Sequence, residues 1–447
     1  MRRKSFPIRL RVALAGLLFL AGTVVMRSEG PQMVGGPPIP GGTQFVPGQP
    51  FVWTINPITY WTDKGTLGPL SNSSATSLVQ SSLQVWLSVP TASINFSQAG
   101  QLPQDVTSYN ILAVLNDMAA CSTPLDPNSA TVIARDRTVI FDTDGSAIEA
   151  LGGDPSGVLG VTIPLCWSSD GTTNFFQRTA AVFNGQFATT FDNTMEATMI
   201  HEFGHMIGLD HSQINLECLA DLCVGAELRG VPIMFPVAIS DRITLSTDDE
   251  AGISVLYPET VNNPPNRVPF STLGRIQGHV YFSDGITPAQ GFNVIARNTT
   301  DPLRIAVSNV SGFLFTACVG VPSTVLPPPW GDCGAIFGST DTTLIGVYDL
   351  PGLPSGTYTV EVEAINDSWP MPFILGSSVG PIGQMGFQFP LYADCTPLYL
   401  GSNSSAGCGS PTHLTVTAGA VVNAGTDVIL NGPTGTLPRY DAWEDGP

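Results

Sequence analysis

The strictest constraint in this chain is an eleven-residue string that holds three of its five histidines. The string reads His201-Glu202-Phe203-Gly204-His205-Met206-Ile207-Gly208-Leu209-Asp210-His211. Because His201 and His205 are four residues apart, a helix places both imidazoles on one face. Gly208 can adopt a positive φ, which ends the helix and returns the chain so that His211 joins the pair. Three converging imidazoles predict a metal site.

Three histidine ligands are typical of a catalytic zinc site, because they leave the fourth tetrahedral position for water. Glu202 follows the first histidine and is not needed as a ligand, so we expect it to act as the general base. Two buried histidines on an ordinary helix are the alternative, but the extended string is far stricter than a chance pair. We therefore predict that His201, His205 and His211 bind one Zn²⁺.

At these residues the chain resembles the metzincin metallopeptidases. Ser212, directly after the third histidine, is typical of the matrixin branch, the matrix-metallopeptidase type. Residues 232–236, with Met234 at their centre, look like the Met-turn that lies beneath the zinc ligands in that family. The resemblance implies a zinc peptidase, with His201, His205 and His211 as ligands and Glu202 as the catalytic residue.

Two further stretches extend this resemblance to about residues 50–258. Leu245–Tyr257, with the paired aspartates Asp248 and Asp249, is similar to the last catalytic helix of matrixins. Trp53–Phe96 loosely resembles the family's first strand and helix. The resemblance implies an α+β catalytic domain over residues 51–258, with a twisted mixed sheet, an active-site helix and a C-terminal helix.

The chain also departs from the family pattern. Pro236 stands where astacin-like and serralysin-like branches carry a zinc-binding tyrosine, so we expect no fifth ligand from the Met-turn. No cysteine lies between the signal and Phe51, so the matrixin cysteine switch is absent. No histidine precedes His201, so the second, structural zinc of animal matrixins is not expected in the same form.

Hydrophobic periodicity predicts the elements around the string. We expect helices over Ser74–Leu87 and Asn193–Ile207, and a third from Thr247 to Tyr257 opened by a capping box with Glu250. Short apolar runs predict strands over Ile111–Leu115, Thr138–Phe141 and Val158–Ile163.

The sequence Asp142-Thr143-Asp144-Gly145 follows one of these strands. Alternating carboxylates before a glycine suit Ca²⁺, which prefers oxygen ligands, so calcium is a second metal to consider. The remaining acidic ligands of an EF-hand loop are missing. We therefore favour a plain Asp-Gly turn.

A second unit follows a Pro- and Asn-rich linker at 259–273. Apolar and polar residues alternate over 275–282 and 357–364, and Val428 and Leu430 close a last strand. We predict an all-β sandwich over 274–447 with a loop-rich insertion at 366–413. By the same alternation His279 faces solvent, and we assign no function to it.

Three stretches of this unit resemble carboxypeptidase-regulatory-like or transthyretin-like sandwiches. They are Gly274–Val280, Asp284–Gly291 and Leu350–Tyr358. The resemblance implies a binding or spacer module. Exposed aromatics such as Trp330, Trp369 and Trp443 are candidates to contact a surface or polymer ligand, although scattered aromatics more often pack internally.

The first thirty residues differ from the rest of the chain. Basic residues, among them Arg9 and Arg11, precede an apolar run from Val12 to Met26. This pattern predicts a secretory signal over 1–30, followed by a Gly/Pro-rich leader over 31–50. The run is short for a membrane span, so an uncleaved anchor is the less favoured alternative. No other stretch of the sequence is apolar enough to cross a bilayer.

Charge and cysteine content narrow the class of protein. The net charge of −19 argues against a nucleic-acid binder and against a polybasic membrane-surface protein. Eight cysteines in an exported chain predict disulfides. Proximity in the sequence favours the pairs 121–166, 218–223, 318–333 and 395–408.

These features together predict a secreted zinc endopeptidase that hydrolyses peptide bonds in extracellular proteins or peptides. The alternative is a secreted adhesion or ligand-binding protein whose metallopeptidase domain is inactive or acts on a single partner. The intact Glu202 favours the enzyme.

Overall fold

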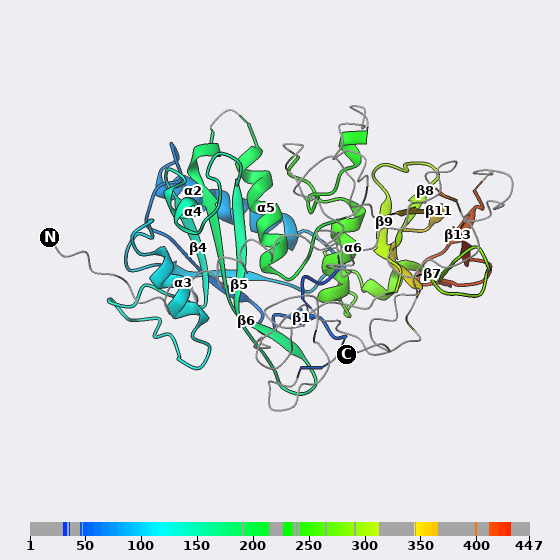
Figure 1. Ribbon diagram of the computed structural model, residues 1–447, viewed down its shortest axis with the longest axis horizontal. Coiled ribbons are helices and arrows are strands. Elements are labelled where there is room, and N and C mark those ends of the chain that lie inside the picture. The colour runs from blue at the N-terminus through cyan, green and yellow to red at the C-terminus, as the bar shows by residue number, and fades with distance from the viewer. Residues whose placement is uncertain are drawn as a thin grey trace.

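The computed structural model describes most of the chain between residues 30 and 430 and shows a mixed α/β protein with several sheets (Figure 1). The described residues are 30–33, 35, 45, 46, 48–189, 192–212, 214, 227–235, 238, 242–263, 266–289, 292–312, 344, 346–364, 398, 399 and 411–430. The expected signal, all but a few residues of the insertion at 366–413, and the three tryptophans of the second unit lie outside them. Within these residues no helix has the length and apolar character needed to cross a membrane.

The N-terminal unit is built on a six-stranded sheet in the order β1-β6-β4-β2-β3, with β5 paired to β6. The strands are β1 (Phe51–Val52), β2 (Ile58–Thr62), β3 (Phe96–Gln101), β4 (Arg137–Asp142), β5 (Gly160–Ser169) and β6 (Asn174–Asn184). β5 runs antiparallel to β6, whereas the other neighbours pair in parallel. The sheet is therefore mixed.

Helices cover both faces of this sheet. They are α2 (Asn72–Leu87), α3 (Ile111–Ala119), α4 (Ser146–Ala150) and α5 (Thr194–Met206). Because successive residues of a strand face opposite sides, β4 contributes to two cores. Val139 and Phe141 pack with α2 and α5, whereas Ile140 packs with α3 and α4. The sheet is thus enclosed between two helical layers.

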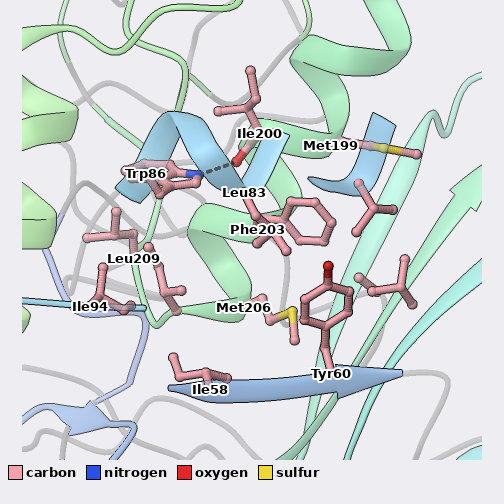
Figure 2. Packing of buried hydrophobic residues seen from close by; sticks show 14 of the residues in the cluster. Ile58, Tyr60, Leu83, Trp86, Ile94, Met199, Ile200, Phe203, Met206 and Leu209 are labelled. Atoms are coloured by element: carbon pink, nitrogen blue, oxygen red, sulfur yellow. Dashed lines mark hydrogen bonds between the residues drawn. The ribbon is translucent and has the colours of Figure 1, made fainter. Parts of the chain in front are cut away.

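The core between α2 and α5 fixes the helix that carries two of the histidines. Trp86 and Leu83 of α2 lie beside Ile200 and Phe203 of α5, and all four are buried (Figure 2). The Trp86 indole Nε1 donates a hydrogen bond of 2.9 Å to the Ile200 carbonyl. Each buried side chain of this size stabilises the fold by about 1.5–3 kcal/mol, so this interface anchors α5 firmly.

Most predicted elements of this unit are confirmed. The helix expected over 74–87 is α2, which begins earlier because the Ser71 hydroxyl accepts a hydrogen bond from the Ser74 amide and caps it. α5, β4 and β5 lie at the predicted positions.

One predicted strand is wrong: residues 111–115 belong to helix α3. A short apolar run cannot be distinguished from a buried helix turn by its hydrophobicity alone. Extended to Met118, the pattern becomes helical, because Ile111, Val114, Leu115 and Met118 are the buried residues of α3.

The helix expected from Thr247 is present as α6 (Thr247–Leu256), but the predicted partner in its capping box is wrong. The N-cap is Ser246, so the third helical position is Asp249 and not Glu250. The Ser246 hydroxyl accepts from the Asp249 amide, and the Asp249 carboxylate accepts from the Ser246 amide. Asp249 replaces the usual glutamate here.

The C-terminal unit consists of two further sheets, ordered β10-β7-β14 with β15 on β7, and β12-β11-β8-β9 with β13 on β11. The strands are β7 (Gly274–Tyr281), β8 (Phe292–Asn298), β9 (Ala306–Val310), β10 (Val347–Leu353), β11 (Gly356–Ala364), β12 (Leu398–Tyr399), β13 (Leu414–Val416), β14 (Val421–Val422) and β15 (Val428–Ile429). The predicted strands are confirmed as β7 and β11, and β7 alternates as expected. In β11 the alternation is broken at Glu361, which is buried and paired with Arg297. The His279 side chain is 42% exposed, as expected.

The two units meet at α6, which lies between the first sheet and the later strands (Figure 1). Ala251 of α6 belongs to the hydrophobic cluster of the C-terminal unit. A Cβ atom placed on Gly352 of β10 would lie 2.7 Å from the Ala251 Cβ, so only glycine allows this close approach. The predicted boundaries at 258 and 274 stay a prediction.

The described part of the linker lies against the N-terminal unit. The Glu259 amide donates to the Thr91 carbonyl, and the Val268 amide donates to the Pro90 carbonyl. The Arg267 guanidinium donates to two carbonyls of the same turn, those of Val89 and Ala92. Three short 3-10 helices complete the described elements: η1 (Gly185–Phe187), η3 (Glu227–Gly230) and η4 (Phe270–Thr272).

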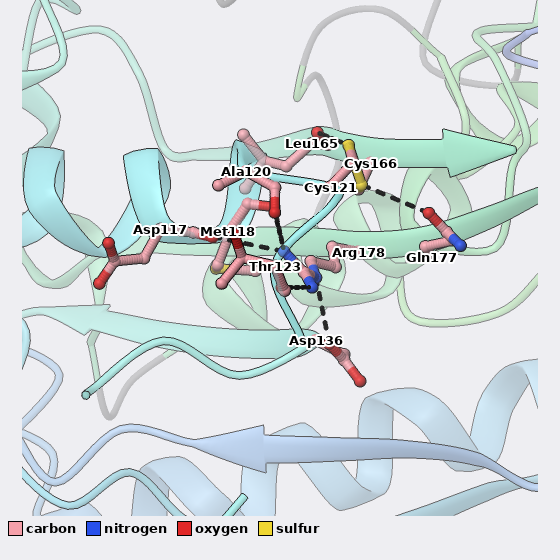
Figure 3. The surroundings of a disulfide bond; sticks show 10 residues. All are labelled: Asp117, Met118, Ala120, Cys121, Thr123, Asp136, Leu165, Cys166, Gln177 and Arg178. Atoms are coloured by element: carbon pink, nitrogen blue, oxygen red, sulfur yellow. Dashed lines mark hydrogen bonds and ion pairs between the residues drawn. A yellow bond between two sulfur atoms is a disulfide. The ribbon is translucent and has the colours of Figure 1, made fainter. Parts of the chain in front are cut away.

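A disulfide fastens the segment after α3 to the sheet. Cys121 bonds to Cys166 of β5, which confirms the pair expected from sequence proximity (Figure 3). Beside it, Arg178 of β6 contacts Asp136 and donates to the carbonyls of Asp117, Met118, Ala120 and Thr123. The other six cysteines lie outside the described residues.

Two carboxyls meet where β2 and β3 end. Asp63 is fully buried, and its carboxylate accepts hydrogen bonds from the amides of Lys64, Val106 and Phe141. The Asp105 carboxyl lies close enough for its negative charge to act on Asp63. Burial and then the nearby Asp105 charge raise the pKa of Asp63 to about 7. The folded state therefore holds a proton that the unfolded chain releases near pH 4.

We expect Asp105→Asn to reduce the pH dependence of stability. A raised carboxyl pKa favours folding at acid pH, and this contribution is lost as the pH rises from about 4 through about 7. The introduced side-chain amide would donate to Asp63 and remove the like charge, so the pKa of Asp63 should fall. A fall of about one pKa unit adds about 1.4 kcal/mol to the free energy of unfolding at pH 8.

Urea unfolding at pH 5 and pH 8 measures this effect. Asp117→Asn, on the exposed face of α3, is the control for losing one negative charge. If Asp105→Asn and wild type lose the same stability between the two pH values, the Asp105 charge does not raise the pKa of Asp63.

Candidate metal centre

The end of α5 places the three histidines. His201 and His205 lie on successive turns of α5, and the helix ends where Gly208 adopts φ +100°. The Gly208 amide donates to the His205 carbonyl, and the Leu209 amide donates to the Gly204 carbonyl. This left-handed end reverses the chain and brings His211 back to the helix, as the sequence predicted.

Two aromatic side chains satisfy carbonyls that the end of α5 leaves without helical partners. Trp53 Nε1 donates to the Met206 carbonyl at 2.7 Å. The Tyr257 hydroxyl donates to the Ile207 carbonyl at 2.7 Å and accepts from the Trp53 amide. The sequence offered no clear signal for this cap, because Trp53 and Tyr257 lie 204 residues apart.

The three imidazoles converge through their Nε2 atoms. The distances are 3.1 Å between His201 and His205, 3.2 Å between His201 and His211, and 3.1 Å between His205 and His211. A tetrahedral ion with nitrogen ligands at about 2.0–2.1 Å sets such nitrogens about 3.3–3.4 Å apart. These three residues form the one group of metal-binding side chains found in the described part of the chain. They could hold a metal ion.

The hydrogen bonds of two histidines fix their tautomers. His201 Nδ1 lies 2.7 Å from the Ile233 carbonyl, and His205 Nδ1 lies 2.9 Å from the Leu209 carbonyl. Because a carbonyl only accepts, each Nδ1 carries the proton and each Nε2 presents a lone pair. Three Nε2 atoms, two of them acceptors only, cannot satisfy one another by hydrogen bonding. A single cation satisfies all three.

Burial keeps the imidazoles neutral. Loss of surrounding water lowers the pKa of His201, lowers that of His205 to about 3, and lowers that of His211 well below its usual value. Neutral imidazole is the form that binds metal ions. The donor chemistry therefore fits a divalent cation.

The turn at Met234 forms the support beneath α5. Met234 is fully buried, and a Cβ atom on Gly204 would lie 2.2 Å from its sulfur. A larger residue at 204 would therefore have to displace the Met234 side chain. Both oxygens of Asp249 accept from this turn, from the amides of Ile233 and Met234 at 3.0 Å. Asp249 thus holds Ile233, and the Ile233 carbonyl orients the His201 ring.

Glu202 follows the first histidine on α5 but is not one of the three converging residues. Its side chain is buried, and its Oε2 has no hydrogen-bond partner among the described residues. Burial raises the pKa of Glu202 to about 7, against the opposing effect of hydrogen bonds from Thr162. Strand β5 lies against it, because a Cβ atom on Gly160 would come within 3.0 Å of the Glu202 Cγ.

The aspartates at 142 and 144 behave as the favoured turn interpretation predicts. Asp142 accepts from the Ile148 amide, and Asp144 accepts from the Ser146 amide. Gly145, which follows them, has φ +83°. Both carboxylates bond to backbone at the start of α4, and neither belongs to a metal-binding group found among the described residues.

Some supporting groups were missed by sequence reasoning. The carbonyls of Ile233 and Leu209 orient two of the ligands, yet backbone atoms leave no residue-type signal. Asp249 stands out in the sequence only as one of a pair at a helix start. Its bonds to the Met234 turn depend on how α6 packs.

Comparison with known proteins gives no assignment. No protein-family model matches the chain, and a search of curated proteins found no significantly similar sequence.

We expect His205→Ala to abolish tight metal binding. Removing even an outer partner of a ligand weakens metal affinity by 10–100-fold, so loss of a ligand should cost more than about 100-fold. Metal content after dialysis, together with titration against a competing chelator, measures the change. His279→Ala, an exposed histidine of the C-terminal unit, is the matched control. Wild-type metal affinity in His205→Ala would rule out this centre.

Proposed function

We propose that this protein is a zinc-dependent endopeptidase of the metzincin type. The observation that carries the proposal is the set of three Nε2 atoms 3.1–3.2 Å apart, with Glu202 directly after the first histidine. The turn at Met234 below Gly204 supports the same interpretation, since the matrixin-like sequence pattern places a methionine there.

Zinc is the metal that the donor set favours. Neutral imidazole nitrogens suit zinc, copper, iron and nickel, whereas Ca²⁺ and Mg²⁺ prefer oxygen. The near-equal spacing of the three nitrogens matches one face of a tetrahedron. Three protein ligands leave a fourth position, which is the arrangement of a catalytic site.

The roles of the residues follow from their positions. His201, His205 and His211 would hold the ion, and the carbonyls of Ile233 and Leu209 keep two of these rings in orientation. Zinc, when bound, would supply Lewis acidity toward the scissile carbonyl and a nearby water. The Glu202 carboxylate would accept a proton from this water as its oxygen attacks the carbonyl carbon, and would pass the proton to the amine that leaves. Its Oε2, which has no hydrogen-bond partner in the described part of the chain, is suited to this exchange.

The wider proposal assigns a domain to each unit. Residues 51–258 would form a matrixin-like catalytic domain, and residues 274–447 a β-sandwich. The basic start and apolar run at 1–30 support export, so the substrates would be extracellular proteins or peptides. N-terminal sequencing of protein recovered from outside the cell tests the export step.

We expect Glu202→Gln to keep its metal and lose its activity. The amide preserves the shape of the buried side chain but cannot accept the proton, so cleavage should fall by at least about 10²–10⁴-fold. The assay is digestion of a mixed peptide library by zinc-loaded protein, with zinc content and melting temperature measured in parallel. Glu149→Gln, on the exposed face of α4, is the matched control.

Each outcome discriminates between functions. Cleavage at the wild-type rate by Glu202→Gln would remove this residue from the mechanism. Wild-type protein that binds zinc but cleaves nothing in a broad library would favour the inactive or single-partner alternative. Full activity after chelation would contradict a metallopeptidase altogether.

A further inference from the structure

Two described residues that follow His211 in the sequence, Ile214 and Gly230, pack against the C-terminal unit. Ile214, three residues after the third histidine, is buried in a cluster with Ile295 of β8 and Ala306 of β9. A Cβ atom on Gly230 would lie 2.5 Å from the Leu303 carbonyl oxygen, so this part of the chain also contacts that unit closely. Strands β8 and β9 therefore pack against a residue that lies three positions beyond the third histidine.

A buried carboxylate connects strand β9 to Ser212, the residue that follows His211. Asp248 of α6 accepts from the Ser212 hydroxyl at 2.5 Å. It also accepts from the Ser308 amide of β9 at 2.7 Å and from the Ser308 hydroxyl at 3.1 Å. All three residues are buried, with exposed fractions of 0% for Ser212, 2% for Asp248 and 6% for Ser308.

In the part of the chain that the structure describes, the ring of His211 is held by fewer hydrogen bonds than the rings of the other two ligands. The Nδ1 atoms of His201 and His205 bond to carbonyls, but His211 Nδ1 has no hydrogen-bond partner among the described residues. The position of its backbone therefore matters more for this ring than for the other two, whose Nδ1 atoms are held by carbonyls. That backbone continues into Ser212, whose amide donates to the Met234 carbonyl and whose hydroxyl bonds to Asp248.

We propose that β9 of the C-terminal unit positions the third metal ligand, through the contacts Ser308–Asp248–Ser212 and through the packing of Ile214. Asp248 and Ser308 are then positioning residues, and the C-terminal unit is a working part of the metal centre rather than only a spacer or a binding module. The consequence for zinc binding rests on the proposed function, but the positioning of His211, Ser212 and Ile214 does not.

The contacts of Asp248 with Ser212 and Ser308 predict measurable effects of three variants. Asp248→Ala removes both serine contacts and should release zinc about tenfold faster, within the range known for outer partners of ligands. Asp248→Asn keeps the shape and should restore most of the retention. Ser308→Ala keeps the amide bond and should have a smaller effect in the same direction.

Ser311→Ala is the matched control within the C-terminal unit. Ser311 is also a buried serine with two hydrogen bonds, to the Phe292 amide and the Ala289 carbonyl, but none of its hydrogen bonds reaches the chain after His211. This variant should lower the melting temperature and leave zinc release unchanged.

The experiment uses the full chain and two readouts. The first is the rate of zinc transfer to a chelator. The second is hydrogen–deuterium exchange of the peptide that contains His211 and Ser212, in metal-free protein. Faster exchange and faster release in Asp248→Ala and Ser308→Ala, but not in Ser311→Ala, support the proposal.

Unchanged exchange at His211 and Ser212 in both variants would overturn it, whatever the metal. If Asp248→Ala does not fold, Ser308→Ala against Ser311→Ala decides. Wild-type protein that retains no zinc would contradict the proposed function, and the exchange measurement would then decide this inference alone.

Discussion

Three imidazole nitrogens held within 3.2 Å of one another are the constraint on which the rest of the structure depends. Bringing lone pairs together in a buried site is unfavourable unless a cation lies between them and the surrounding groups hold the rings. The fold supplies that support at each ligand. The packing of α2 on α5, the close contact of Gly204 with Met234 and the reversal at Gly208 all serve the same geometry.

Helix α6 links this centre to both parts of the chain. Its first turn carries two buried aspartates with different partners. Asp249 bonds to the turn at Met234 and so fixes the carbonyl that orients His201. Asp248 bonds to Ser212 and to Ser308 of β9. Neighbouring carboxylates on one helix thus support two different ligands of the histidine cluster.

The sequence predicted the centre better than its surroundings. The spacing of His201, His205 and Gly208 depends only on helix periodicity and on the freedom of glycine, so local rules were sufficient. The apolar run at 111–115 was misassigned, because its helical character appears only with Met118 and the face that the sheet covers. The contact between Asp248 and Ser308 joins positions 60 residues apart. Such a contact is set by tertiary packing and leaves no local pattern.

A crystal structure of the zinc-loaded protein, with anomalous scattering recorded on both sides of the zinc absorption edge, tests the central claim most directly. We predict one strong anomalous peak about 2.0–2.1 Å from the Nε2 atoms of His201, His205 and His211. The Oε atoms of Glu202 should lie outside that coordination shell. No peak between the three rings, or a zinc held by other residues, would contradict the account.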